Sequence, residues 1–333
     1  FEVIDPATGE PFAEAPEATR EQLDEAVAAA RRAFAGWSQT SLEERKRVLT
    51  DITAAIKPKI PELADLLVRE QGKPRDRASS EAAGAMTWFR VTAGYDLPVE
   101  VVRDDEGGRI EVRRRPIGVV GGITPWNFPL ILATWKIAPA LLTGNTIVLK
   151  PSPYTPLTTL VLGELIREVV PPGVVNIVSG GDELGRWMTT HPGIDKISFT
   201  GSVETGKAIM AAVAPDLKRL TLELGGNDAG IVLPDVDVEQ AAPRIFEAAF
   251  GNTGQVCSAL KRLYVHEDVY DPMCEALVEL ARKAKVGPGS EEGVDFGPLN
   301  NEMQLRKVID LVEDAKAHGA RVLVGGERMD RPG

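Results

Sequence analysis

The sequence predicts an α/β fold: a mostly parallel sheet with helices on both faces, preceded by a β-hairpin. Three observations indicate this class. From residue 117 onward, short apolar segments alternate with helical ones, as in successive strand–helix units. The apolar segments are nearly continuous, which is typical of strands buried on both faces. Residues 97–118 alternate in polarity around an Asp-Glu-Gly-Gly turn, which is typical of a hairpin.

The bulk composition is that of an ordinary globular chain and excludes several function classes. The 333 residues are 43% hydrophobic and 26% charged, with a net charge of −11. This acidic balance argues against a broad surface for nucleic acid or for an anionic membrane. Two cysteines cannot build a disulfide framework, so a reducing, cytoplasmic compartment is favoured. No apolar run approaches the length of a transmembrane helix.

The first hundred residues are predicted to be mainly helical after a short extended start. Leu23, Val27, Ala30 and Phe34 recur at helical spacing. A second helix begins at Ser41, where the Ser-x-x-Glu pattern predicts a capping box. A third helix is predicted over residues 76–95.

The remaining elements follow as strand–helix cycles. Strands are predicted at 117–123, 145–150, 173–179, 195–200, 219–224 and 229–233, with helices at about 130–143, 156–170, 182–190 and 203–213. A further cycle comprises a helix at 236–250, a strand at 261–266, helices at 268–285 and 300–318, and a strand at 320–324. The sequence stops in a Gly-rich turn just after this strand, so we expect it to end in mid-domain.

Ligands of open α/β sheets bind at the carboxyl ends of the strands, so the loops that follow the strands carry the candidate chemistry. These loops read TPWNFP, KPSPYTP, GSVETG and GGND, and we expect them to meet at one edge of the sheet. Gly201, Ser202 and Gly206 would let backbone N–H groups approach a phosphate at a helix N-terminus. A plain tight turn is the alternative.

Three side chains are candidates for catalysis, each with a simpler explanation beside it. Asn127, stiffened by prolines on both sides of its loop, could donate to an oxyanion, or it could be an ordinary turn residue. Glu223 could be a general base, or a charge at the sheet edge. Cys257, in a Gly-flanked loop, could be a nucleophile, although free cysteines are usually buried and inert. Cys274 fits that inert description, on a helix.

Five motifs together resemble the aldehyde dehydrogenase superfamily, in its NAD(P)-dependent hydrolytic branch. LELGGNDA contains Glu223, and FGNTGQVCSALK contains Cys257, 34 residues later; both resemble active-site signatures of the family. PWNFP, VLKPSPYTPL and ISFTGSVETG occur in the family's order and spacing. The resemblance runs from about Val3 to Gly333. It implies a Rossmann-type cofactor-binding domain at 1–96 and 117–225, a protruding oligomerisation hairpin at 97–116, and a second α/β domain, the catalytic one, at 226–333, incomplete at its C-terminus.

The resemblance also implies roles for individual residues. Cys257 would attack the aldehyde, Asn127 would hold the oxyanion and Glu223 would activate water to release the acid. The residues implied in NAD or NADP binding are Thr124, Trp126, Lys150, Ser152, Gly201, Ser202, Gly206 and Leu224. Phe128 and Trp135 would line an aldehyde funnel, and no metal is implied. The full-length protein would be a homo-oligomer, dimer or tetramer, that acts on a small-molecule aldehyde.

Two departures from the family pattern leave alternatives open. Many NAD-preferring members have Glu three residues after the ribose-binding lysine, where this chain has Pro153, so NADP use is open. Family members also continue well beyond the point where this chain ends, so a truncated or non-catalytic scaffold remains an alternative. A CoA-acylating enzyme is a further alternative, against which Glu223 argues. A His-dependent cysteine hydrolase is disfavoured, because none of the three histidines lies in a motif loop.

Overall fold

The computed structural model describes residues 1–331, which form two compact units. Unit 1 comprises Phe1, Glu14–Leu66 and Ser79–Glu223. Unit 2 comprises Glu2–Ala13, Leu67–Ala78 and the residues from Leu224 onward. No helix in the described part of the chain is both long and apolar enough to cross a membrane.

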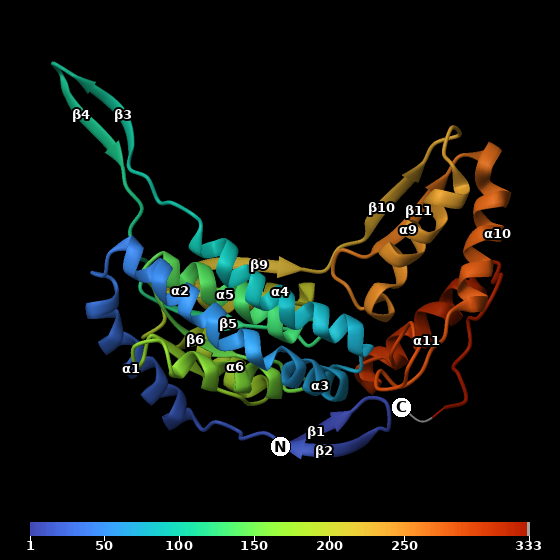
Figure 1. Cartoon of the computed structure of the whole chain (residues 1–333), viewed down its shortest axis with the longest axis horizontal. Coiled ribbons are helices and arrows are strands. Elements are labelled where there is room, and N and C mark those ends of the chain that lie inside the picture. Colours follow the sequence, from blue (N-terminus) through green and yellow to red (C-terminus); the bar gives the residue numbers. More distant parts are fainter. Residues whose placement is uncertain (332–333) are drawn as a thin grey trace. The chain divides into compact units, whose positions relative to one another are not determined.

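Unit 1 is built on a five-stranded sheet with the order β7-β6-β5-β8-β9 (Figure 1). The strands are β5 (Val119–Ile123), β6 (Thr146–Lys150), β7 (Val175–Ile177), β8 (Lys196–Gly201) and β9 (Arg219–Leu224). The pairs β5–β6, β5–β8 and β6–β7 are parallel, which confirms the predicted parallel sheet. Strand β7 is shorter than the predicted 173–179. The direction of chain progression reverses between β5 and β8, so the switch point lies there.

The two central strands are buried along their whole length, as their apolar sequences predict. Every residue of β5 and β6 is buried. Two glycines of β5 make room for bulky neighbours, since a Cβ on Gly122 would lie 2.6 Å from a methyl group of Leu149. A Cβ on Gly121 would lie 2.8 Å from Ile197. Side chains of the neighbouring strands thus fill the space that these glycines leave.

Helices cover both faces of this sheet, because right-handed crossovers on opposite sides of the switch point place them there. Helices α5 (Pro129–Leu142) and α6 (Leu157–Arg167) pack together and against α2 (Leu42–Ile56). Helix α1 (Arg20–Trp37) packs against α7 (Asp182–Thr190), which contacts α8 (Val203–Val213). Two short 3₁₀ turns complete the unit, at Lys57–Lys59 and Ala214–Asp216.

The N-terminal helices agree with the sequence prediction in part. The Ser41 side chain accepts from the backbone of Glu44, but the complete capping box forms at Thr19 with Gln22, a site that the prediction missed. The prediction also missed α3 (Ile60–Gln71). Helix α4 (Arg75–Ala93) confirms the predicted third helix.

The predicted hairpin forms from β3 (Glu100–Asp105) and β4 (Gly108–Val112), which are antiparallel. All residues of β3 are exposed, and the hairpin projects from the rest of unit 1 (Figure 1). Its turn is the Asp-Glu-Gly-Gly segment that predicted it.

Unit 2 contains two small sheets and three long helices. Strand β1 (Glu2–Asp5) pairs with β2 (Glu10–Glu14), and β10 (Asp228–Val232) pairs in parallel with β11 (Leu260–Val265). The helices are α9 (Val238–Phe250), α10 (Glu267–Lys283) and α11 (Glu302–Ala317). Val232, Ala242 and Met273 form the core between β10, α9 and α10.

The prediction of a strand at 320–324 is wrong. Residues 320–324 adopt no strand, and Val322, Leu323 and Val324 are 45%, 44% and 40% exposed. A strand is stable only when its backbone groups pair with a neighbour. Among the described residues no strand pairs with this segment, so its apolar pattern alone does not make it extended.

Candidate active site

The carboxyl ends of β5, β6 and β8 bring three of the predicted loops of unit 1 to one edge of its sheet. Ile123, at the end of β5, is in register with Lys150 on β6 and with Phe199 on β8. The loops that follow, beginning at Thr124, Pro151 and Ser202, therefore start beside one another. This edge, next to the switch point, is where an α/β sheet binds its ligand.

The loop after β5 is tied to the loop after β6 by hydrogen bonds. The backbone N–H of Thr124 donates to the carbonyl of Lys150 at 3.1 Å. The Thr155 hydroxyl donates to the carbonyl of Trp126 at 3.4 Å. The Thr124 hydroxyl is buried and has no hydrogen-bond partner among residues 1–331. A buried hydroxyl without a partner is costly, so this atom is suited to a ligand group.

Lys150 places a buried amine at the end of β6. Only 4% of this residue is exposed, and Nζ donates to the carbonyl of Pro151 at 3.3 Å. Burial lowers the pKa of Lys150 from 10.5 to about 8, although Asp182 and Glu17 oppose this. Ser152 is also buried, and its hydroxyl accepts from the N–H of Tyr154 at 3.3 Å. The loop thus offers an ammonium group and a hydroxyl to a ligand, with Pro153 between Ser152 and Tyr154.

The loop after β8 begins helix α8. The Ser202 side chain caps the helix by accepting from the N–H of Thr205 at 3.1 Å. Gly206 is buried in the first turns of this helix. Gly201 lies so close to the Phe199 ring that a Cβ would come within 2.4 Å of it. The predicted small residues therefore let the start of α8 lie close to β8, and they leave the first helical N–H groups available for an anion.

Glu223 lies at the end of β9, and its side chain is exposed. Its negative charge acts on Lys136, a buried lysine that was not among the residues predicted from the sequence. Lys136, on α5, donates to the hydroxyl of Thr200 at 2.8 Å and to that of Ser198 at 3.3 Å. Burial lowers the pKa of Lys136 to about 8, while the charge of Glu223 opposes that lowering. A single lysine in the apolar run LILATWKIAPALL was the sequence signal.

Asn127 and the predicted funnel residue Phe128 come just before α5, and the other predicted funnel residue, Trp135, lies within that helix. Asn127 and Phe128 are half-buried in the last part of the loop, and Phe128 is the N-cap residue of the helix. Trp135 is 44% exposed, and its ring centroid lies 5.1 Å from that of Trp88 on α4. Trp88 was not among the residues predicted to line the funnel.

Cys257 belongs to unit 2, as does Leu224, and follows an unusual turn. Asn252, Thr253 and Gly254 have φ angles of 51°, 58° and 73°, so three consecutive residues are left-handed. This conformation costs about 1–2 kcal/mol for each residue other than Gly, and Thr adopts it rarely because it is β-branched. Residues of the loop before α11 hold the turn: the Thr253 hydroxyl donates to the Gly297 carbonyl at 2.9 Å, and the Asn300 N–H donates to the Gln255 side chain at 2.9 Å.

The backbone of Cys257 is fixed while its side chain is exposed. The Cys257 carbonyl accepts from Nζ of Lys261 at 2.8 Å and from the N–H of Gly226 at 3.2 Å. Cys257 is exposed, whereas Cys274 on α10 is only partly exposed. The nucleophile candidate thus projects from a loop whose backbone is anchored on both sides.

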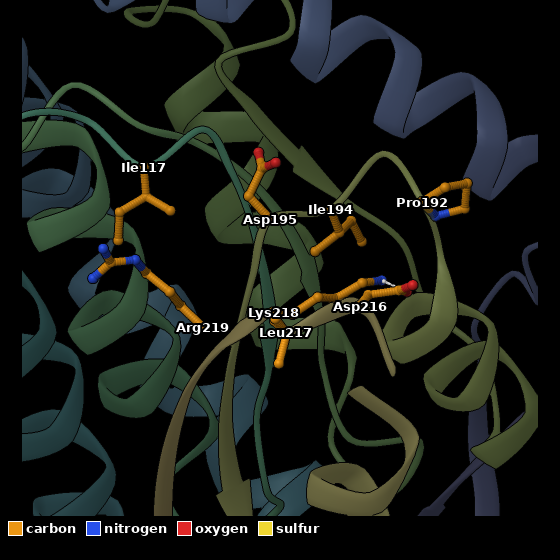
Figure 2. Close-up of a pocket in the computed structure, with 8 residues that line it drawn as sticks. All are labelled: Ile117, Pro192, Ile194, Asp195, Asp216, Leu217, Lys218 and Arg219. Atoms are coloured by element: carbon orange, nitrogen blue, oxygen red, sulfur yellow. Dashed lines mark ion pairs between the residues drawn. The ribbon is translucent and has the colours of Figure 1, made fainter. Parts of the chain in front are cut away.

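A pocket of about 470 Å³ lies elsewhere in unit 1 (Figure 2). Its lining residues precede β5, β8 and β9 or begin β9, so it lies at the edge of the sheet opposite to the candidate loops. Two of its lining residues, Lys218 and Asp216, form the ion pair drawn in Figure 2, at 3.7 Å. None of the predicted site residues lines this pocket. Among residues 1–331, no group of three or more His, Cys, Asp or Glu residues could hold a metal ion.

Comparison with known proteins decides the family. The model of the aldehyde dehydrogenase family matches residues 1–333. The chain belongs to the aldehyde dehydrogenase family. It is 42% identical over 327 residues to the aldehyde dehydrogenase LUC3 of a Fusarium species, and the match covers 98% of this chain and 68% of that relative.

Solved structures support the same assignment. The NAD⁺ complex of an aldehyde dehydrogenase from Bacillus cereus is 39% identical, with a TM-score of 0.97, and the match covers 100% of this chain and 69% of that one. Betaine aldehyde dehydrogenase from Staphylococcus aureus, in a complex with NAD⁺ and with a BME-modified cysteine, is 36% identical, with a TM-score of 0.95. That match covers 99% of this chain and 68% of that one. The reaction of this aldehyde dehydrogenase is the oxidation of an aldehyde to a carboxylic acid with NAD or NADP.

Proposed function

We propose that Cys257 is the nucleophile of this aldehyde oxidation. The observation that carries the proposal is the contrast within its loop: the thiol is exposed, while two donors fix the carbonyl of the same residue. A nucleophile must be accessible and must also be aimed, because misplacement by about 1 Å can reduce a rate about 10²-fold. The second cysteine, Cys274, lies within helix α10 and is less exposed.

The chemistry follows from the groups that the chain carries. The Cys257 thiolate attacks the aldehyde carbon, and the C–S bond forms as the carbonyl oxygen becomes an oxyanion. The Asn127 side-chain amide and the Cys257 backbone N–H donate to that oxyanion. Glu223 or a water molecule takes the thiol proton, because the thiolate and not the thiol is the nucleophile. After oxidation to the thioester, Glu223 activates the water that displaces Cys257 and releases the acid.

The residues at the edge of the sheet fit a nicotinamide dinucleotide. The unpaired, buried hydroxyl of Thr124 and the buried amine of Lys150 are polar groups that a ribose or phosphate would satisfy. Ser202, with Gly201 and Gly206, opens a helix N-terminus suited to a pyrophosphate. Trp126, Ser152 and Leu224 complete the proposed set. A bound nicotinamide would supply the acceptor for the hydride that leaves the carbon attached to Cys257.

Glu223 favours hydrolysis over acyl transfer to CoA, because it supplies the base that a hydrolytic step needs. Phe128 and Trp135 favour an apolar aldehyde, since both are aromatic: Phe128 is the N-cap residue of α5 and Trp135 lies within that helix. Pro153 leaves NADP use open, because no carboxylate at that position repels a 2′-phosphate.

The organisation of the protein is part of the same proposal. Residues 1–96 and 117–225 would form the cofactor-binding domain, and residues from 226 onward the catalytic one. The exposed hairpin, proposed as 97–116, has the apolar residues Val101, Val102 and Ile110 on its surface, which favours a role in a homo-oligomer. The low cysteine content favours a reducing, cytoplasmic compartment.

The cysteine variants test the proposal directly. In Cys257→Ala, aldehyde-dependent reduction of NAD or NADP should fall at least about 10³-fold, because the proposed nucleophile is lost. Cys274→Ala is the matched control and should keep the parent rate of the chemical step. Comparable rates in the parent and in Cys257→Ala would contradict the assignment.

A further inference from the structure

Helix α5 begins without any cap from its own sequence. Its N-cap residue, Phe128, has no side-chain hydrogen bond to the helix, and its first turn has no acidic residue. Pro129, at the first helical position, has no N–H to satisfy. The N–H groups of Leu130 and Ile131 remain, and buried donors of this kind need an acceptor from outside the helix.

Glu81, on helix α4, supplies that acceptor. One of its carboxylate oxygens accepts from the N–H of Leu130 at 3.0 Å and from the N–H of Ile131 at 3.3 Å. The next N–H, of Leu132, donates to the carbonyl of Phe128 at 3.0 Å. Glu81 is only 5% exposed, and a carboxylate is rarely buried so far without a specific partner. At the start of a helix, the macrodipole also stabilises its negative charge.

The same contact fixes one end of the loop that contains Asn127. On the other side of Asn127, the Trp126 carbonyl accepts from the Thr155 hydroxyl. Asn127 therefore lies between two anchors, Trp126 and the first turn of α5. Helices α4 and α5, which lie side by side in Figure 1, also meet at a second point, because Trp88 contacts Trp135. Trp88 is seven residues after Glu81, so both project from the same side of α4.

We propose that Glu81 is a positioning residue for Asn127. Its carboxylate replaces the missing N-cap of α5, and it thereby holds the Asn127 amide where the oxyanion develops. The proposal rests on the proposed role of Asn127. It gives Glu81 a part in the reaction, although α4 carries none of the proposed catalytic groups. Glu81 acts as a hydrogen-bond acceptor at this helix end and takes no part in proton transfer.

The test compares Glu81→Gln, which keeps a side-chain acceptor, with Glu81→Leu, which removes it. Ser41→Ala is the matched control, because it removes the N-cap of α2, another helix of unit 1. Two quantities are measured: amide hydrogen exchange of residues 124–132, and the rate of the first hydride transfer at saturating cofactor and aldehyde. The cofactor dissociation constant is measured alongside.

We expect Glu81→Leu to accelerate exchange in this segment at least about 10-fold and to slow hydride transfer about 10²-fold, as loss of one oxyanion donor does. Glu81→Gln should stay within about 10-fold of the parent in both, because its amide oxygen still accepts. Ser41→Ala should lower thermal stability but change neither quantity. The cofactor dissociation constant should change less than about 3-fold in all variants, because the effect is on Asn127.

A double variant separates positioning from general structure. In an Asn127→Ala background, adding Glu81→Leu should slow hydride transfer no further, because coupled residues are non-additive. Faster exchange in Glu81→Leu with an unchanged hydride-transfer rate would overturn the proposal, as would equal losses in Glu81→Gln and Glu81→Leu. A parent enzyme without hydride transfer would instead contradict the proposed function, and the exchange rates would still decide whether Glu81 holds the loop.

Discussion

Replacing Lys150 with methionine should make the unliganded fold more stable while abolishing its stabilisation by cofactor. The buried amine has a pKa of about 8, against 10.5 for an exposed lysine, and burial is the main cause. Each pH unit of that difference corresponds to about 1.4 kcal/mol, so the charged amine destabilises the fold by about 3 kcal/mol at pH 7. Methionine has no charge, so this destabilisation disappears. The substitution also removes one hydrogen bond, to the Pro151 carbonyl, worth about 1 kcal/mol. The expected net gain is about 2 kcal/mol.

The sign of the pH dependence follows from the same pKa difference. Because the pKa of Lys150 is lower in the folded than in the unfolded chain, the unfolded chain binds more protons between pH 8 and 10.5. The parent should therefore gain about 2 kcal/mol from this residue between pH 7 and pH 9.5. The Lys150→Met variant should lack that gain.

The assay is urea unfolding at pH 7 and pH 9.5, followed by circular dichroism, with and without NAD. Lys136→Met is the informative comparison, because Lys136 has a similarly lowered pKa but is not among the proposed cofactor contacts. That variant should keep the NAD-dependent stabilisation, whereas Lys150→Met should lose it. Exposed Lys57 provides a surface control, Lys57→Met. Destabilisation of Lys150→Met by more than about 1 kcal/mol, or a retained response to NAD, would refute the reasoning.

Three further predictions concern the base, the cofactor and the Cys257 loop. Glu223→Gln should give a burst of hydride transfer without turnover, because oxidation precedes hydrolysis; steady turnover at the parent rate would exclude Glu223 as the hydrolytic base. The parent should discriminate between NAD and NADP by less than about 10² in kcat/KM, and Pro153→Glu should shift the preference towards NAD by weakening NADP; a parent that strongly rejects NADP would contradict this. Gly297→Ala should lower the free energy of unfolding by at least about 2 kcal/mol, because its Cβ would meet the Gly72 carbonyl oxygen at 1.9 Å. Gly36→Ala, in α1 with nothing within 4 Å, should stabilise by about 0.5–1 kcal/mol instead, and chemical denaturation of both variants checks the difference.

The sheet of unit 1 was predictable because its central strands, β5 and β6, are nearly continuous apolar runs and its strands are separated by recognisable turns. Helix α3 was not predicted, because prolines at 58 and 61 interrupt the segment from which it begins. The strand at 320–324 failed for the opposite reason: its local pattern was apolar, but a strand also needs a partner, which a local pattern cannot supply.

The sequence predicts those site residues that lie in loops of distinctive composition. Cys257, Glu223 and Lys150 were found from their motifs. Lys136 was missed, because its burial depends on how α5 packs on β8, whose hydroxyls it meets. The left-handed turn at Thr253 could not be inferred either, since the Gly297 carbonyl that holds it lies 44 residues away. Glu81 was hidden for the same reason, since its partners are 49 and 50 residues distant.

The central claim is that the aldehyde becomes covalently bound to Cys257 as a thioester. The most direct measurement is mass spectrometry of the Glu223→Gln variant, quenched in acid after mixing with cofactor and propanal. The account predicts a propionyl group on the tryptic peptide that ends at Lys261 and contains Cys257, formed in proportion to the hydride transferred. The same group on another residue, or hydride transfer with Cys257 unmodified, would contradict it.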